Sequence, residues 1–175
     1  MEIPVHFIVP PNVNAGFDSG SNSLMVRPQL GVLTLSAILK QAEISTRVLD
    51  LAAQPQTVAA CVHQINGEVT RGVGIYAISQ MTVRVVELIR ALKRQLPEVR
   101  IVVGGPGYSG RDEFLAAGAD GVVLGEADDT IARVVDFMDG SVPARDVPGM
   151  AHLEEGVPVE NLLPPAIANL DSLPY

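Results

Sequence analysis

A glycine-rich segment, Gly105-Pro106-Gly107-Tyr108-Ser109-Gly110, follows an apolar run and matches the G-x-G-x-x-G pattern of dinucleotide-binding sites. Glu126 comes about 20 residues later, where that pattern places an acidic residue that binds a ribose. In such sites, however, the motif follows the first strand of the sheet, and a helix starts inside it. Here the apolar run is the fourth along the chain, and Pro106 interrupts the motif. Three interpretations of this segment therefore stay open: a nicotinamide-binding site, a tight glycine turn that binds nothing, and a site for another kind of ligand.

Short polar or glycine-rich segments follow the other apolar runs as well. If the runs are parallel strands, these segments meet at one edge of the sheet, where ligands bind in open α/β folds. None of them is basic, and they contain no catalytic triad, paired-carboxylate site or metal-binding cluster. The pattern is typical of a site for a large, mostly apolar ligand rather than for acid–base chemistry. The segments are Pro10-Pro11-Asn12, Ser79-Gln80-Met81-Thr82, Gly104-Gly105-Pro106-Gly107 and Gly125-Glu126-Ala127-Asp128.

The elements that must position these segments alternate between strand and helix patterns. Most of the strand-like runs are continuously apolar, which indicates strands buried on both faces. Between them lie segments with helical spacing, the first with Leu30, Leu33, Ile38 and Leu39 on one stripe. The alternation predicts a flavodoxin-like α/β fold, with a five-stranded parallel sheet in the order 2-1-3-4-5 inside three αβα layers. The expected strands are Ile3–Val9, Thr46–Leu51, Val73–Ile78, Arg100–Val103 and Gly121–Leu124.

Two regions depart from this alternation. Residues 10–29 form a long loop after the first expected strand, and loops of that length inside compact domains are usually functional. Residues 141–175 contain six prolines and cannot form a continuous helix. Within them, Met150–Leu153 and Val157–Val159 predict a small hairpin, and the rest reads as an extended arm or linker. We therefore divide the chain into an α/β domain over residues 1–140 and a hairpin with a linker over residues 141–175.

Composition narrows the possible partners. The 175 residues carry a net charge of −8 and have a pI near 4.7, so a nucleic-acid or anionic membrane partner is not expected. The N-terminus has no signal-peptide pattern, and no apolar run is long enough to cross a bilayer. The single cysteine, Cys61, cannot form an internal disulfide. These features predict a cytoplasmic location.

Six segments of the chain occur in the same order as similar segments in a known protein family. They are Pro10-Pro11 with Arg27–Leu33, Arg47–Asp50, Gly74–Ser79 with Thr82, Val102–Gly105, Val122–Glu126, and Pro148-Gly149 with Leu170–Pro174. Together they resemble the N-terminal cobalamin (vitamin B12)-binding domain of cobalamin-dependent radical SAM enzymes, most often methyltransferases. The resemblance covers nearly the whole chain.

The resemblance implies that the chain binds cobalamin for methyl transfer on a neighbouring catalytic domain. Ser79 and Gly104-Gly105 would line a slot for the dimethylbenzimidazole tail, and Gly125-Glu126 would border its end or the corrin amides. The 10–29 loop and Gln80-Met81 would face the corrin ring. The alternatives are ordinary: Ser79 would cap the following helix, and Met81 would lie in the core. The expected cofactor-binding residues are Pro11, Asn12, Ser79, Gln80, Met81, Thr82, Gly104, Gly105, Gly107, Gly125 and Glu126.

Two departures from known cobalamin and radical SAM motifs matter. The D-x-H-x-x-G motif of other cobalamin proteins is absent, with Pro11-Asn12-Val13-Asn14 in its place, so histidine ligation of cobalt from that motif is not expected. His6, His63 and His152 read as structural or solvated residues. The C-x-x-x-C-x-x-C motif of radical SAM enzymes is also absent. S-adenosylmethionine and the iron–sulfur cluster would therefore be bound by another domain, in cis or in trans.

The sequence ends at Pro174-Tyr175, about where the catalytic barrel of such enzymes would begin. We therefore expect either an excised N-terminal domain or a stand-alone relative, and no catalysis by the chain alone. Two other functions stay open at this point. The chain could be a degenerate domain of the same fold that acts as an interaction module without cobalamin, or a small nicotinamide- or flavin-binding oxidoreductase.

Overall fold

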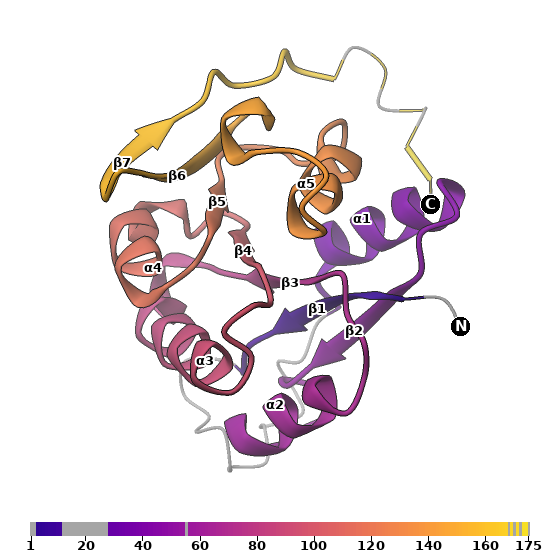
Figure 1. Ribbon diagram of the computed structural model, residues 1–175. Coiled ribbons are helices and arrows are strands. Elements are labelled where there is room, and N and C mark those ends of the chain that lie inside the picture. Colours follow the sequence, from indigo (N-terminus) through magenta and orange to yellow (C-terminus); the bar gives the residue numbers. More distant parts are fainter. Residues whose placement is uncertain are drawn as a thin grey trace.

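The computed structural model describes residues 3–11, 28–54, 56–167, 169, 171, 173 and 174. Within these residues, strands and helices alternate up to a C-terminal hairpin (Figure 1). The strands are β1 (Val5–Val9), β2 (Thr46–Asp50), β3 (Gly72–Tyr76), β4 (Ile101–Gly104), β5 (Gly121–Val123), β6 (Met150–Glu154) and β7 (Val157–Glu160). The α-helices are α1 (Leu30–Gln41), α2 (Val58–Asn66), α3 (Thr82–Gln95), α4 (Arg111–Ala117) and α5 (Ile131–Met138). Short 3-10 turns are η2 (Ser79–Met81), η3 (Tyr108–Gly110) and η4 (Ala144–Asp146).

The strands form one sheet in the order β2-β1-β3-β4-β5-β6-β7. The first five are parallel, which confirms the predicted flavodoxin-like order. The expected five-stranded sheet is wrong, because the hairpin adds two strands: β6 pairs antiparallel with β5, with Ala151 opposite Val122 and Met150 opposite Val123. Met150 and Ala151 are completely buried, so this strand extends the apolar core. The segment from residue 141 onward thus contributes strands to the same sheet.

Helices cover both faces of the sheet, as the three-layer prediction requires (Figure 1). Helices α1 and α5 pack on one face, and α2, α3 and α4 pack on the other. Neighbouring strand residues therefore enter different cores: Val102 faces α1 and α5, whereas Val103 faces the opposite helices. This two-sided burial explains why the inner parallel strands are almost continuously apolar rather than alternating, whereas the edge strand β2 carries Thr46, Arg47 and Asp50.

The hairpin has its own local determinants. Glu155 and Gly156 both have positive φ values, 52° and 83°, as a two-residue type I′ turn requires. After β7, the Asn161 side-chain amide donates hydrogen bonds to the carbonyls of Ala144 and Val147, each at 2.7 Å. These bonds fix the point at which the arm leaves the hairpin. The arm then crosses the edge of the sheet towards α1 (Figure 1).

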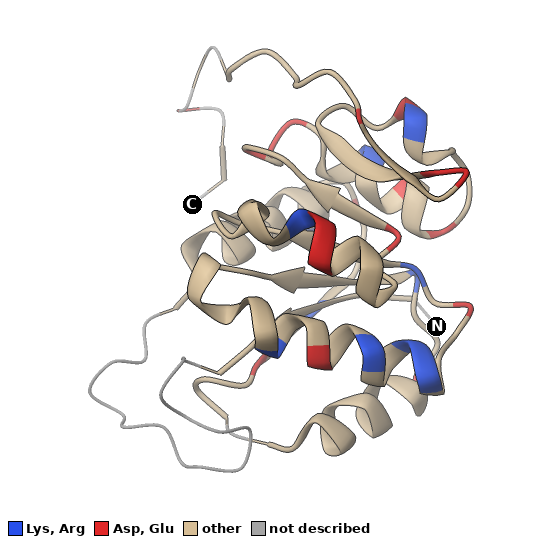
Figure 2. Cartoon of the chain, turned by 90° about the vertical axis from the view of Figure 1, so that its left-hand side faces the viewer, with Lys and Arg blue, Asp and Glu red and all other residues tan. Residues whose placement is uncertain are grey.

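Acidic and basic residues are interspersed along helices α3 and α4 (Figure 2). Some of them pair locally, as Arg84 does with Glu87 at 3.3 Å and Arg111 with Asp112 at 2.8 Å. This face is a solvated, mixed-charge surface rather than a basic patch. Among the described helices, none combines the length and apolar character needed to cross a membrane.

Candidate functional site

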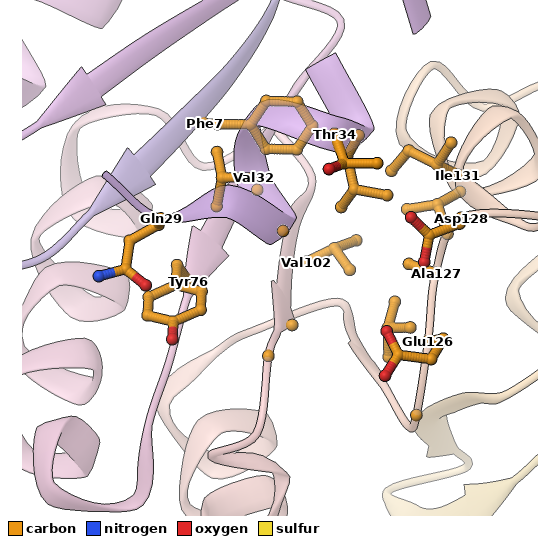
Figure 3. A pocket seen from close by; sticks show the side chains of 18 of the residues that line it. Phe7, Gln29, Val32, Thr34, Tyr76, Val102, Glu126, Ala127, Asp128 and Ile131 are labelled. Carbon is orange, nitrogen blue, oxygen red and sulfur yellow. The ribbon is translucent and has the colours of Figure 1, made fainter. Parts of the chain in front are cut away.

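A pocket of about 580 Å³ lies at the carboxyl edge of the parallel strands, between the sheet and helices α1 and α5 (Figure 3). Its size is within the range of roughly 300–1,000 Å³ that is common for small-molecule sites. It is built by strand residues, by two helices, by the loops after β4 and β5, and by the arm. The lining residues are Phe7, Gln29, Gly31, Val32, Thr34, Leu35, Gly74, Ile75, Tyr76, Val102, Gly104, Gly105, Pro106, Val123, Gly125, Glu126, Ala127, Asp128, Ile131, Val134, Met138, Ile167 and Leu173.

The pocket has a buried apolar part and a polar entrance. The fully buried lining side chains, such as Phe7, Val102 and Val134, are all apolar. The polar lining residues are partly or fully exposed. Figure 3 shows Gln29 and Tyr76 on one side and Glu126 and Asp128 on the other. A bound molecule would therefore place a hydrophobic group inside and hydrogen-bonding groups near solvent.

Two glycines leave room for that molecule. A Cβ added at Gly104 would have Val123 Cβ, 4.0 Å away, as its nearest neighbour. A Cβ added at Gly31, inside the first turn of α1, would meet nothing within 4 Å. Neither residue has a positive φ, so neither the packing nor the backbone conformation requires glycine there. A glycine within a helix lowers the stability of the helix by about 1 kcal/mol relative to alanine. Gly31 therefore has no advantage for the fold, and its position in the pocket wall suggests a role in leaving space.

The glycines of the G-x-G-x-x-G match have a different explanation. A Cβ on Gly107 would lie 2.6 Å from the backbone carbon of Ile78. One on Gly110 would lie 2.8 Å from the Phe114 ring. Gly105 has a φ of 102° and its Cβ would lie 2.7 Å from the Ala77 carbonyl oxygen. The motif therefore allows the turn after β4 to pack against the chain after β3, which accounts for these glycines without a pyrophosphate.

The charges at the pocket also disfavour a pyrophosphate ligand. The lining includes the carboxylates of Glu126 and Asp128 and no Lys, Arg or His among the described residues. Burial raises the pKa of the Tyr76 phenol above its ordinary value, so this group is a neutral hydrogen-bonding group at neutral pH. The pocket is thus unsuited to a ligand that depends on ion pairing of its phosphates.

Part of the sequence-predicted site is brought together here. Gly104, Gly105, Gly125 and Glu126 all line the pocket. Gly125 has a φ of 78°, which allows the chain to turn sharply after β5. The structure thus brings glycines after β4 and an acidic residue after β5 to one pocket, and their role in binding a cofactor stays a prediction.

The other predicted site residues, which follow β1, β3 and β4, are not among the residues that line the pocket. Ser79 does not line the pocket, and its hydroxyl oxygen is 3.2 Å from that of Ser109. Met81 is 2% exposed and belongs to the core beneath α3. Gln80, Thr82 and Gly107 are also outside the pocket lining. Pro11 is buried but is not among the lining residues, and Asn12 lies outside the described residues.

Sequence reasoning missed the pocket's side walls. It considered the loops after strands, whereas Gly31 and Thr34 come from α1, and Phe7 and Tyr76 come from strands. Gly31 could have been identified from the sequence, because it is a glycine inside a predicted helix that does not serve as a helix cap.

The remaining candidate chemical groups serve the fold. His6 is completely buried in β1, with its Nδ1 2.9 Å from the Thr70 hydroxyl and its Nε2 3.2 Å from the Glu68 carboxylate. Burial raises the pKa of the Cys61 thiol to about 11, so this side chain is protonated and unreactive. In the described part of the chain, no group of three His, Cys, Asp or Glu residues is arranged to hold a metal ion.

Comparison with protein families gives one model that matches residues 21–135, described as the B12 binding domain. The chain belongs to the B12-binding domain family. The match runs from before α1 into the first five residues of α5, and it includes most of the strand residues that form the pocket. Curated protein sequences give no match to this B12-binding domain.

Solved structures share the fold of this B12-binding domain at low sequence identity. A radical S-adenosylmethionine methyltransferase, TsrM, from Kitasatospora setae, with cobalamin and a [4Fe-4S] cluster bound, matches with a TM-score of 0.73, 16% identity and 93% of this chain covered. The cobalamin-dependent S-adenosylmethionine radical enzyme OxsB, with aqua-cobalamin and S-adenosylmethionine bound, matches with a TM-score of 0.75, 15% identity and 94% coverage. The B12-binding domain spans 31% of the TsrM chain and 23% of the OxsB chain.

A CheY-like protein, tadZ, from Pseudomonas aeruginosa PAO1 also matches, with a TM-score of 0.53 and 14% identity. This match covers 82% of the B12-binding domain and 98% of that protein. The same layered α/β architecture is therefore shared beyond the cobalamin enzymes, and the pocket rather than the fold must carry the functional argument.

Proposed function

We propose that the chain binds cobalamin and holds its nucleotide tail in the pocket between the sheet and helices α1 and α5. The observation that carries this proposal is the pair Gly31 and Gly104. Both line the pocket, and packing explains neither of them. In a member of the B12-binding family, the space that they leave is best assigned to the cofactor.

The residues present fit such a group. The tail of cobalamin ends in a flat aromatic base, which matches the apolar walls formed by Phe7, Val102 and Val134. Near the entrance, Gln29, Glu126 and Asp128 offer hydrogen-bonding oxygens, and Gln29 also offers an amide N–H, for the amides around the corrin ring. Because none of the three histidines lines the pocket, we propose that cobalt receives no histidine ligand from this chain.

Cobalamin, when bound, supplies a carrier for a methyl group. The residues of the chain would exclude water from the tail and fix its orientation at the edge of the sheet. The pocket lining contains no pair of a nucleophile and a base within the described residues, so we propose that catalysis occurs on a partner domain. That partner would be a radical SAM domain, in cis or in trans, which would itself bind S-adenosylmethionine and an iron–sulfur cluster.

Three exposed apolar side chains at the carboxyl edge of the parallel strands support docking of such a partner. Leu30 begins α1 and is 74% exposed, and Val83 in the first turn of α3 is 70% exposed. Leu162, in the arm just after β7, is 91% exposed. All three lie at the same edge of the sheet as the pocket. Apolar groups gathered at one edge are typical of a surface that another domain covers.

Reconstitution tests the proposed function. The purified chain is mixed with hydroxocobalamin, desalted, and examined by visible absorption. We expect a retained corrinoid spectrum without the features of histidine ligation. A folded chain that retains no colour would contradict cobalamin binding and favour an interaction module. A flavin band, or thermal protection by NAD, would instead favour an oxidoreductase.

A further inference from the structure

The buried part of the pocket contains no hydrogen-bonding side chain. Among the described residues, the buried polar side chains are His6, Thr130 and His152, and none of them lines the pocket. The strand backbone along the wall is paired in the parallel ladder, with Val102 in register with Gly74 of β3 and Gly121 of β5. A group that reaches the inner wall therefore meets hydrocarbon.

Two hydroxyls stand apart from this description. Those of Thr34 on α1 and Tyr76 on β3 belong to lining residues whose side chains are only partly buried. Each provides one donor and a small number of acceptor positions near the entrance. They can therefore partner polar groups near solvent, and not the several groups spread along an aromatic edge that reaches the inner wall.

Natural corrinoids differ in the base at the end of the tail, and this difference matters for such a wall. The six-membered ring of a benzimidazole presents only carbon and hydrogen. The six-membered ring of adenine presents two ring nitrogens and an amino group, each of which gives up water on burial. Leaving such a group unpaired lowers affinity by roughly 10- to 100-fold.

We infer that this pocket selects corrinoids with a benzimidazole-type base over corrinoids with a purine base. The inference rests on the proposed function, because it assigns the tail to this pocket. The selectivity would be set by buried apolar residues on two sides of the pocket. They are Phe7, Val102 and Val123 from the sheet, and Ile131 and Val134 from α5.

Equilibrium titrations of the purified chain with three corrinoids test this inference. They are cobalamin, its adenine-containing analogue, and cobinamide, which has no base. We expect cobalamin to bind at least about 10-fold more tightly than the adenine analogue, and the analogue to bind about as weakly as cobinamide. Equal affinities for cobalamin and the adenine analogue would overturn the inference.

The remaining outcomes separate the inference from the proposed function. Equal affinities for all three corrinoids would leave corrin binding intact but overturn the assignment of the tail to the pocket. Absence of binding by all three would contradict the proposed function and the inference with it.

A matched pair of substitutions on β4 localises the selectivity. Val102 faces the pocket and is 3% exposed, whereas Val103 faces the other core and is 1% exposed. Val102→Thr places a hydroxyl on the wall and should reduce the preference for cobalamin over the adenine analogue several-fold. Val103→Thr should leave that ratio unchanged. If both variants keep the wild-type ratio while circular dichroism shows native folding, the wall does not set the selectivity and the inference is wrong.

Discussion

Gly104 and Val123 lie side by side on β4 and β5, on the face that packs against α1 and α5. A Cβ on Gly104 would make an ordinary 4.0 Å contact with the Val123 Cβ and would meet no other neighbouring atom within 4 Å, so the space in front of Gly104 is open. Protein interiors rarely leave such space unfilled. The gap is therefore best explained by a group that the protein binds.

The same reasoning makes Gly31 testable in α1. Gly31→Leu replaces a poor helix former with a good one, so we expect the free energy of unfolding to rise by up to about 1 kcal/mol. The same side chain would narrow the pocket and weaken cobalamin binding. Urea denaturation and a cobalamin titration measure the two effects. Leu33→Ala is the control, because Leu33 is exposed on the same helix and does not line the pocket.

Gly107 should respond in the opposite way. Gly107→Ala forces a Cβ to within 2.6 Å of the Ile78 backbone, so we expect a loss of about 1–3 kcal/mol in the free energy of unfolding. Gly104→Ala, the same change three residues earlier, should cost little because its Cβ enters open space. Equal stability of the two variants in urea would contradict the packing explanation for the G-x-G-x-x-G match.

His6 predicts a dependence of stability on pH. Burial, the largest cause, lowers the pKa of His6 below its ordinary value of about 6.5, despite the opposing effect of Glu68. The unfolded chain therefore binds a proton more readily than the folded one, and stability should fall as the pH drops through about 6.5. Urea unfolding between pH 8 and pH 5 measures this, and His6→Asn should flatten the profile. The matched control is His63→Asn on α2, which removes an exposed imidazole and leaves the buried contacts of His6 with Thr70 and Glu68 in place.

Local patterns were sufficient to predict the parallel part of the fold. Mostly apolar runs marked β1 and β3 to β5, because strands buried on both faces leave few positions for polar residues, whereas the edge strand β2 carries Thr46, Arg47 and Asp50. They did not predict that β6 joins the sheet, because its pairing with Val122 and Val123 depends on a surface that only the assembled sheet provides. The expected stripe on α1 was also wrong in part: Leu30 and Leu33 are 74% and 44% exposed.

The candidate site was also predicted only in part from the sequence. Gly104, Gly105, Gly125 and Glu126 were predicted because the ends of parallel strands always share one edge. Whether a loop then turns towards α1 and α5 or towards α3 is a tertiary property. The segment after β3 enters η2 and buries Met81 under α3, which takes Ser79 away from the pocket. No local signal in those residues distinguishes the two directions.

The most direct measurement is a cobalamin titration of Gly104→Val beside Gly67→Val. Gly67 also has an ordinary φ and room for a side chain, but it lies at the end of α2, away from the pocket. We expect the Gly104 variant to remain folded and to bind cobalamin about 10- to 100-fold more weakly than the wild type, because the added side chain occupies the slot. The Gly67 variant should bind as the wild type does. Wild-type affinity in a folded Gly104→Val variant would contradict the assignment of the cofactor tail to this pocket.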